Sequence, residues 1–365
     1  MNSIEIRPMG LLVLALITLS ACGAAPSAAP QAASQPAQSA PASAAARPSA
    51  SPFVGERTAI QYGLLGSFTN AITFVPVETG AEAAQGLDIS ITTFTDTVQI
   101  MVSVGSGQLQ MGNITLGAAA LNALNRGIDL KILASSTQDP PGHGMNAPAV
   151  ARTDLYDSGA LTTPAQLKGR KFSINAKGNV QDYQVAKLLA RGGLKPSDVE
   201  MVYMPYPDMV IAFGNKSIDA ADMLQPTAAV AMSKGVARLL SDDFSPNTQL
   251  AVLVVNGKFA EQHRDALERF LQVHIQTARK FDDGGLRRDD QALAIVEKYT
   301  KVAPEITRQV SDPYWPKDGK INVESLQDQQ NYYLLAKSVD YTQPIAFEKF
   351  IDYSYLDAAL KKIGG

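Results

Sequence analysis

The two halves of this chain carry the same succession of helices and strands, and this internal repeat limits the possible folds more than any other feature. Residues 96–133 and residues 208–240 each begin with an acidic residue that opens a helix, followed by a strand, an Ala-rich helix and a second strand. Two copies are too few for a solenoid, which needs about three repeats or more. The repeat therefore predicts two similar α/β lobes.

Short β-rich runs alternate with helical patterns through both halves, which predicts mainly parallel sheets with crossover helices. One such helix, over residues 181–191, has its apolar stripe on Val185, Leu188 and Leu189 and ends at Gly192-Gly193, where glycine accepts a left-handed conformation. Ligands of open α/β sheets bind at the carboxyl ends of the strands, so two facing lobes predict a ligand cleft between them. The expected strands are Thr58–Gly63, Leu87–Thr93, Leu109–Gly112, Leu130–Ala134, Lys171–Asn175, Val199–Met204, Ala220–Leu224 and Ala237–Leu240.

The N-terminal segment has the composition of a secretory signal. Its apolar run, Leu11–Leu19, is much shorter than the roughly 20 residues that a membrane-spanning helix needs. The tetrapeptide Leu19-Ser20-Ala21-Cys22 resembles the lipobox of bacterial lipoproteins. This resemblance implies a signal peptide over residues 1–21 and a lipid, with fatty acyl chains such as palmitate, on Cys22.

A tether is expected to follow Cys22. Residues 23–52 are almost wholly Ala, Pro, Ser and Gln, with Arg47 as the only charge. Such a segment buries too little apolar surface to offset the entropy of folding, so we expect a disordered linker over residues 22–54. Together with the lipid, it predicts a location at the cell membrane, on the extracytoplasmic face.

The composition argues against nucleic-acid and metal binding. Lys and Arg total 32 against 35 Asp and Glu, a formal net charge of −3, which leaves no basic excess for nucleic acid. Cys22 is the only cysteine, so no disulfide or thiolate chemistry is expected in the folded body. His263 and His274 are about 16 Å apart along a predicted helix, too far to share an ion. His143 lies in a turn, and we expect neither a metal nor a cofactor.

Four segments of the body together resemble the nitrate, sulfonate, taurine and thiamine-precursor binding proteins of ABC importers (SsuA-like), which have the type II periplasmic binding protein fold. The segments are Val104-Gly105-Ser106-Gly107-Gln108-Leu109-Gln110-Met111-Gly112, Leu161-Thr162-Thr163-Pro164-Ala165-Gln166-Leu167-Lys168-Gly169-Arg170-Lys171, Pro205-Tyr206-Pro207-Asp208-Met209-Val210 and Ile218-Asp219-Ala220-Ala221. The resemblance implies a lobe 2 over residues 149–249, inserted between two parts of lobe 1 at 55–148 and 250–365. It also implies a monomeric protein that serves a membrane permease and an ATPase.

The loops that follow the strands predict the lining of the cleft. Most of their side chains are neutral and able to hydrogen-bond, and several begin helices, whose free N–H groups favour anions. Helix capping alone would explain any one of them, whereas the set as a whole favours a binding cleft. The expected ligand-binding residues are Phe68, Asn70, Thr95, Asn113, Thr115, Ser136, Lys177, Asn179, Tyr183, Tyr206 and Gln225.

Three further residues near these loops are given structural roles. Asp96 and Asp208 each start a helix, where a negative side chain is favourable, so both are interpreted as helix caps rather than ligand contacts. Trp315 lies in a late loop and is expected to pack on a lobe.

The expected lining suits a neutral or weakly anionic organic ligand. Phe68, Tyr183 and Tyr206 are able to stack on a flat ring. Lys177 is the only cation in these loops, whereas a small inorganic anion such as nitrate would call for a denser basic pocket. Many relatives have Glu where Gln225 stands, and the missing charge argues against a cationic group at that point. Sulfonates, pyrimidine thiamine precursors and flavins stay open as ligands.

An enzyme of the same fold is the main alternative. Some relatives of this fold synthesise a thiamine pyrimidine and have a cysteine cluster, which this chain lacks. The run Gly105-Ser106-Gly107 fits neither a nucleophile elbow nor a phosphate-binding loop. A structural surface protein would not need two lobes around a cleft. The sequence therefore predicts a lipoprotein that binds a small organic solute and is not an enzyme.

Overall fold

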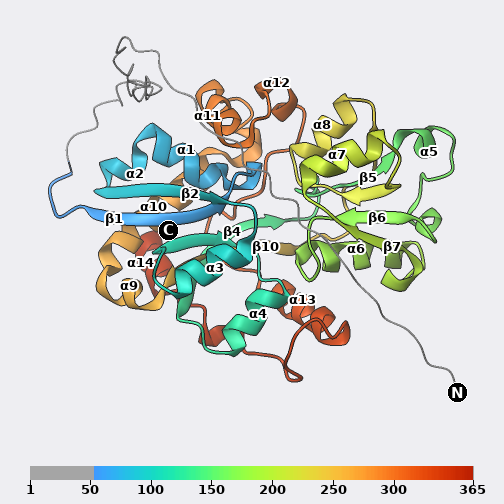
Figure 1. Cartoon of the computed structure of the whole chain (residues 1–365). Helices are drawn as coiled ribbons and strands as arrows, with labels where there is room; N and C mark the ends of the chain where they lie inside the picture. The colour runs from blue at the N-terminus through green and yellow to red at the C-terminus, as the bar shows by residue number, and fades with distance from the viewer. Residues whose placement is uncertain (1–52, 365) are drawn as a thin grey trace, which may run out of the picture. The chain divides into compact units, whose positions relative to one another are not determined.

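The computed structural model describes residues 53–364, which form two α/β lobes with one five-stranded sheet each (Figure 1). Cys22 and the rest of the expected signal and linker up to residue 52 lie outside the described residues. Lobe 1 (residues 53–139 and 248–364) contains β1 Thr58–Leu65, α1 Ala71–Thr79, α2 Ala81–Ala84, β2 Leu87–Phe94, α3 Thr97–Gly105, β3 Met111–Ile114, α4 Ala118–Asn125, β4 Leu130–Asp139, β10 Thr248–Asn256, α9 Gly257–Gln262, α10 Arg264–Lys280, α11 Asp290–Thr300, α12 Pro304–Thr307, α13 Val323–Leu335 and α14 Ser354–Lys362. Lobe 2 (residues 149–241) contains β5 Ala149–Arg152, α5 Thr153–Asp157, β6 Lys171–Ile174, α6 Val180–Arg191, β7 Glu200–Tyr203, α7 Tyr206–Gly214, β8 Ala220–Asp222, α8 Thr227–Ser233 and β9 Ala237–Ser241.

The two sheets have the same topology, which confirms the fold class predicted from the repeat. The strand order is β2-β1-β3-β10-β4 in lobe 1 and β7-β6-β8-β5-β9 in lobe 2. In each sheet the fourth strand, β10 or β5, follows the last strand of the other sheet in the chain and runs antiparallel to its neighbours. The chain therefore crosses between the lobes twice, over residues 140–148 and 242–247.

All eight expected strands are present, with ends shifted by no more than a few residues except for β4, which continues to Asp139. The strands β5 and β10 are absent from that expectation. The four residues of β5, Ala-Val-Ala-Arg, have little intrinsic strand preference. Strand β10 is buried at every position, so its sequence shows no alternation of apolar and polar residues.

Helices cover both faces of each sheet, which explains the continuous burial of β10 (Figure 1). Val252 and Val254 pack in the apolar cluster with α3, α4 and α13, whereas Leu253 and Val255 pack in the cluster with α1, α10 and α14. In lobe 2, α6 carries the predicted stripe into the core and is followed by Gly193 at φ 69°, the left-handed residue expected at its end.

The second crossing is fixed by Gln249, a fully hydrogen-bonded buried side chain at the start of β10. Its Nε2 donates to Ser135 Oγ at 2.9 Å and to Thr137 O at 3.0 Å. Its Oε1 accepts from Gln138 Nε2 and from the backbone N–H of Asn322, each at 2.9 Å. These contacts join β4 and β10 to the start of α13, so they hold this side of lobe 1 in one arrangement.

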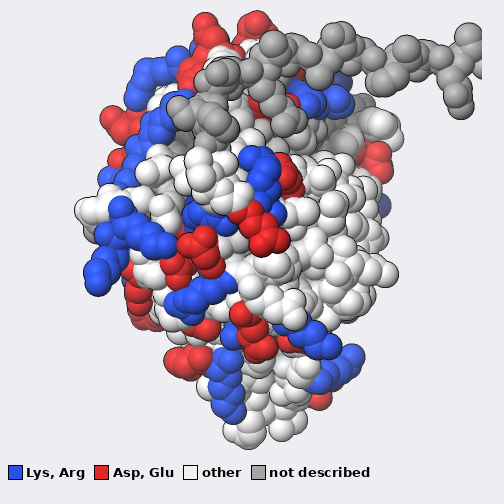
Figure 2. Space-filling view, turned by 90° about the vertical axis from the view of Figure 1, so that its left-hand side faces the viewer, with Lys and Arg blue, Asp and Glu red and all other residues white. Residues whose placement is uncertain are grey.

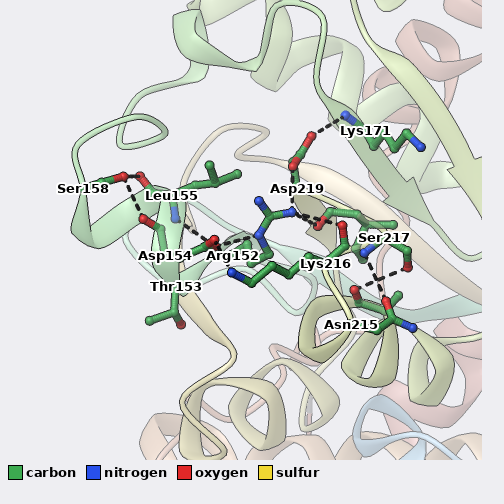
Figure 3. A network of polar contacts seen from close by, with 12 residues as sticks. Arg152, Thr153, Asp154, Leu155, Ser158, Lys171, Asn215, Lys216, Ser217 and Asp219 are labelled. Atoms are coloured by element: carbon green, nitrogen blue, oxygen red, sulfur yellow. Dashed lines mark hydrogen bonds and ion pairs between the residues drawn. The ribbon is translucent and has the colours of Figure 1, made fainter.

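The motif residue Asp219 has a structural role at the edge of the lobe 2 sheet that lies away from the expected ligand cleft (Figure 3). Its carboxylate accepts from Arg152 Nη1 at 2.9 Å and from the backbone N–H of Lys171 at 3.0 Å. Arg152 also bonds Asp154 at 2.6 Å and the carbonyl of Ile218 at 3.0 Å. Asp219 precedes β8 and Lys171 begins β6, so this network ties the amino ends of the strands, away from the ligand edge.

His274 is a buried histidine in the core of lobe 1. Its Nε2 lies 3.3 Å from Ser135 O, whereas Nδ1 has no partner among the described residues. Burial lowers the pKa of His274 from 6.5 to about 4. Between these two pH values His274 binds a proton in the unfolded chain but not in the folded protein. His274 therefore makes the free energy of unfolding fall as the pH is lowered.

We expect His274→Gln, which can still donate to Ser135, to remove this acid sensitivity. Each unit of pKa difference corresponds to about 1.4 kcal/mol, so the wild type should lose about 3 kcal/mol relative to the variant between pH 7 and pH 4. Urea unfolding of both proteins at several pH values measures the difference. Comparison with the variant is needed because Asp139, whose pKa is raised by burial to about 6, acts in the opposite direction. Parallel stability curves for the two proteins would contradict this account.

Candidate ligand-binding site

The two lobes meet at loops that follow parallel strands. At the start of α4, the backbone N–H of Ala118 donates to the carbonyl of Gly178, in the loop after β6, at 2.7 Å. A Cβ atom on Gly117 would lie only 2.6 Å from the same carbonyl, so this close approach requires glycine. The carboxyl ends of the two sheets therefore face each other, as the strand-end rule requires of a ligand cleft.

Helices α13 and α6 form a second contact between the lobes. Tyr333 donates its hydroxyl to the carbonyl of Asn179 at 2.9 Å. Asp328 on α13 accepts from Tyr183 Oη at 2.7 Å and from Lys187 Nζ at 2.8 Å, both on α6. The predicted ligand residue Tyr183 is thus engaged in this contact by its hydroxyl.

Lobe 1 brings two of the predicted ligand residues together. Asn113, in β3, donates from Nδ2 to Ser136 Oγ, in β4, across the intervening strand β10. Both side chains are buried, as is Asn70, whose Oδ1 accepts from Ser67 Oγ at 2.9 Å. Polar side chains from β3, from β4 and from the segment after β1 are thus buried inside lobe 1.

The other predicted ligand residues of lobe 1 form no hydrogen bond with Asn113, Ser136 or Asn70. Thr115 Oγ1 lies 3.2 Å from Thr97 Oγ1, and Thr95 is exposed. Phe68 is fully buried in the apolar core of lobe 1, so its ring has no free face for stacking on a ligand.

The predicted residues of lobe 2 lie at the starts of helices and in the loops before them. Asn179 caps α6, and its Oδ1 accepts from the backbone N–H of Asp182 at 3.2 Å. Lys177 is exposed in the preceding loop, and Tyr206 is half-buried as the first residue of α7. Gln225 Oε1 accepts a backbone N–H of α8 at 3.2 Å.

A pocket of about 410 Å³ opens where α8 and the first crossing of the chain meet residues 309–311 of lobe 1. Gln225 is the predicted ligand residue that lines it, together with Met145 and Asp242 of the two crossings. A smaller pocket of about 170 Å³ adjoins it beside Trp315. Both pockets lie at the crossings rather than among the other predicted residues.

The structural roles predicted for Trp315 and Asp96 are confirmed. Trp315 is buried against lobe 1, and its Nε1 donates to the carbonyl of Thr69, which fixes the loop after β1. Asp96 caps α3 by accepting a backbone N–H at 2.7 Å. The capping role of Asp208 is wrong, because α7 begins two residues earlier, at Tyr206, and has no side-chain cap. Its charge in the first turn still favours the helix dipole.

Two buried carboxylates near the crossings were missed by the sequence reasoning. Asp139, the last residue of β4, accepts from Asn146 N at 3.0 Å, Asn146 Nδ2 at 2.8 Å and Gln184 Nε2 at 3.0 Å. Asp222, the last residue of β8, is fully buried, and neither of its oxygens has a partner among the described residues. The sequence contained a signal for Asp222, because an acidic residue within the otherwise apolar run Ala220–Leu224 is unusual for a buried strand.

Surface charge gives no sign of a polyanionic partner on the face of lobe 1 shown in Figure 2, where Lys and Arg are interspersed with Asp and Glu. Among residues 53–364, no group of three His, Cys, Asp or Glu side chains is placed to hold a metal ion. Within the same range, none of the helices has the length and apolar character needed to span a bilayer.

Known proteins resemble this chain in sequence over most of the body. A Brucella abortus protein, provisionally named a binding protein, is 26% identical over 236 residues, which cover 64% of this chain and 68% of that protein.

Solved structures of binding proteins share the fold. The nitrate-binding protein NrtA from Synechocystis superposes with a TM-score of 0.72 at 14% identity, covering 85% of this chain and 90% of that one. The alkanesulfonate-binding protein SsuA from Xanthomonas axonopodis, bound to MOPS, has a TM-score of 0.65 at 14% identity, covering 82% and 99%. The desulfurization enzyme DszB also superposes, with a TM-score of 0.58 at 16% identity, covering 84% and 100%. The fold is thus that of type II periplasmic binding proteins, and it occurs in an enzyme as well.

A family model supplies the assignment that these low identities do not. The model of the NMT1-like family matches residues 55–295, which include both sheets and both crossings. The chain therefore belongs to the NMT1-like family.

Proposed function

We propose that this protein is the solute-binding component of an ABC-type importer and captures a small organic solute between its two lobes. The contact between Ala118 and Gly178 carries this proposal, because it brings the ligand edges of the two sheets together. Asn113, Ser136 and Asn70 are buried polar residues of lobe 1, and under this proposal they are hydrogen-bonding partners of the solute. The fold shared with nitrate-binding and alkanesulfonate-binding proteins supports the same class.

The ligand class we favour is a sulfonate-like or heteroaromatic compound, such as a pyrimidine or a flavin. An inorganic anion is disfavoured because Lys177, the cation expected in the cleft, is exposed and has no charged neighbour of the same sign beside it in the loop sequence. Tyr206 is half-buried at the start of α7, and its aromatic face would suit a flat ring.

The first experiment is a ligand screen of the purified full chain by thermal shift and calorimetry, against alkanesulfonates, pyrimidines, flavins, nitrate and sulfate. A true solute at 100 times its Kd stabilises the protein by about 2.7 kcal/mol, which should raise Tm by roughly 5 °C or more. The competing class is an enzyme, for which the fold of DszB is the precedent. Conversion of a compound by the chain alone, without any Tm shift in the screen, would contradict the binding function.

Closure of the cleft is tested by Gly117→Ala. The backbone of Gly117 is at φ −72° and ψ 178°, which alanine adopts freely, so the variant should fold normally. Its Cβ would collide with the carbonyl of Gly178, so we expect the affinity for any solute found in the screen to fall about 10-fold or more. Gly214→Ala is the matched control, because nothing lies within 4 Å of a Cβ at that position. Wild-type affinity in Gly117→Ala would mean that the bound state does not need this contact.

We further propose that the protein is held at the extracytoplasmic face of the cell membrane by a lipid on Cys22 and acts there as a monomer beside a permease and an ATPase. The sequence Leu19-Ser20-Ala21-Cys22 and the linker composition of residues 23–52 support this location. Such a tether would keep the binding protein near its importer.

Cys22→Ser should move the protein out of the membrane fraction. The substitution removes the thiol that takes the lipid and leaves the folded body, which lies beyond residue 52, unchanged. Immunoblots of membrane and soluble fractions from cells that express each form measure the outcome. Equal membrane association of the two forms would exclude lipidation at this residue as the anchor.

A further inference from the structure

Asp222 has the least satisfied buried side chain near the facing edges of the lobes. It ends β8, the central strand of lobe 2, and it pairs in register with Ala149 at the start of β5. Its side chain is fully buried, and both carboxylate oxygens are without a hydrogen-bond partner in the described part of the chain. Native proteins leave few such groups unpaired, and those they leave call for a functional explanation.

No described group donates a hydrogen bond to the carboxyl oxygens of Asp222. Asp139 is close enough for its charge to raise the pKa of the Asp222 carboxyl, after the larger effect of burial. Gln184 gives its Nε2 to Asp139 and Ser245, and its Oε1 has no partner among residues 53–364. No Lys or Arg within that range forms an ion pair with Asp222, so the protein itself supplies nothing to neutralise the acid.

The position of Asp222 is that of a ligand group. It lies at the carboxyl end of its strand, the edge where the loops of the two lobes meet. The charge of Asp222 raises the pKa of the hydroxyl of Tyr206, in addition to the larger effect of burial, so the predicted ligand residue Tyr206 lies nearby. Gln225, three residues later, lines the pocket at the crossings.

We propose that Asp222 anchors the solute by accepting hydrogen bonds from a ligand nitrogen that carries hydrogens, so that the solute is an ammonium compound or an aminated heteroaromatic ring. This inference rests on the proposed function and narrows its ligand class. The amino group supplies the donors that the site lacks, and its removal leaves a buried carboxylate unpaired, which is a strong basis for discrimination. A plain sulfonate or nitrate offers acceptors only and has no hydrogen to donate to Asp222.

The test uses matched probes that differ in one amino group. Calorimetry with the full chain compares taurine with ethanesulfonate, and 4-amino-2-methylpyrimidine with 2-methylpyrimidine. We expect an aminated member to bind at least 10-fold more tightly than its match. Asp222→Asn keeps the shape and removes the charge, and it should abolish that preference by weakening the aminated member about 10- to 100-fold. Asp208→Asn, at an exposed position of the same lobe, is the control and should leave both affinities unchanged.

Stability separates a ligand role from a structural one. An unpaired buried acid destabilises the unliganded protein, so Asp222→Asn should raise its Tm at pH 7.5 while it lowers affinity. A lower Tm with unchanged affinity would overturn the inference in favour of a structural acid.

The remaining outcomes are equally decisive. Equal binding of aminated and plain probes would overturn the inference and leave the proposed function standing. If another compound of the screen binds instead, Asp222→Asn must weaken it at least 10-fold, and a smaller effect overturns the inference. Absence of any ligand in the whole screen would count against the proposed function itself.

Discussion

Each crossing of the chain between the lobes enters a sheet as an internal antiparallel strand, and the arrangement of the site depends on this constraint. Strand β10 lies between β3 and β4, and β5 lies between β8 and β9. An internal strand forms hydrogen bonds along both of its edges, so neither crossing can slide without breaking two ladders. The two crossings are therefore fixed at their ends, and the segments between them, 140–148 and 242–247, are the places where relative motion of the lobes can occur.

The buried polar side chains near these crossings differ in whether they receive hydrogen bonds. Gln249 uses its donors and acceptors fully and Asp139 receives three hydrogen bonds, so both hold the surrounding backbone in one geometry. Asp222 is buried within the same region and receives none from the described residues. The fold thus supplies hydrogen-bond donors to Asp139 but none to Asp222. Under our proposal, the donors for Asp222 come from the solute.

The sequence predicted the fold well because the strands β1–β4 and β6–β9 are short β-rich runs separated by helical patterns. The two crossing strands were missed for physical reasons: β5 is four Ala-rich residues, and β10 is apolar on both faces. The order of the two sheets nevertheless follows from the repeat, since each copy contributes the same four parallel elements.

The site was less predictable, because strand ends locate loops but not side chains. The rule brought Asn113 and Ser136 to the same place, where they form a hydrogen bond. It could not show that Phe68 would be buried in the core or that Tyr183 would donate a hydrogen bond to Asp328. Both contacts depend on C-terminal helices that are more than a hundred residues away in the sequence. Asp222 was overlooked because the expected strand, Ala220–Leu224, placed it two residues before the strand end, whereas β8 ends at Asp222.

The contacts that hold the lobes together are individually weak, and under the proposed function they leave room for a solute to decide between open and closed states. A neutral hydrogen bond such as that between Ala118 and Gly178 contributes about 1 kcal/mol. The ion pair of Lys187 with Asp328 is 43% and 51% exposed, and such pairs contribute about 0–1 kcal/mol. A shift from 1% to 99% closed needs a preference of about 5.5 kcal/mol for the closed state. These contacts supply only part of that preference, so a solute that touches both walls can decide when the lobes close.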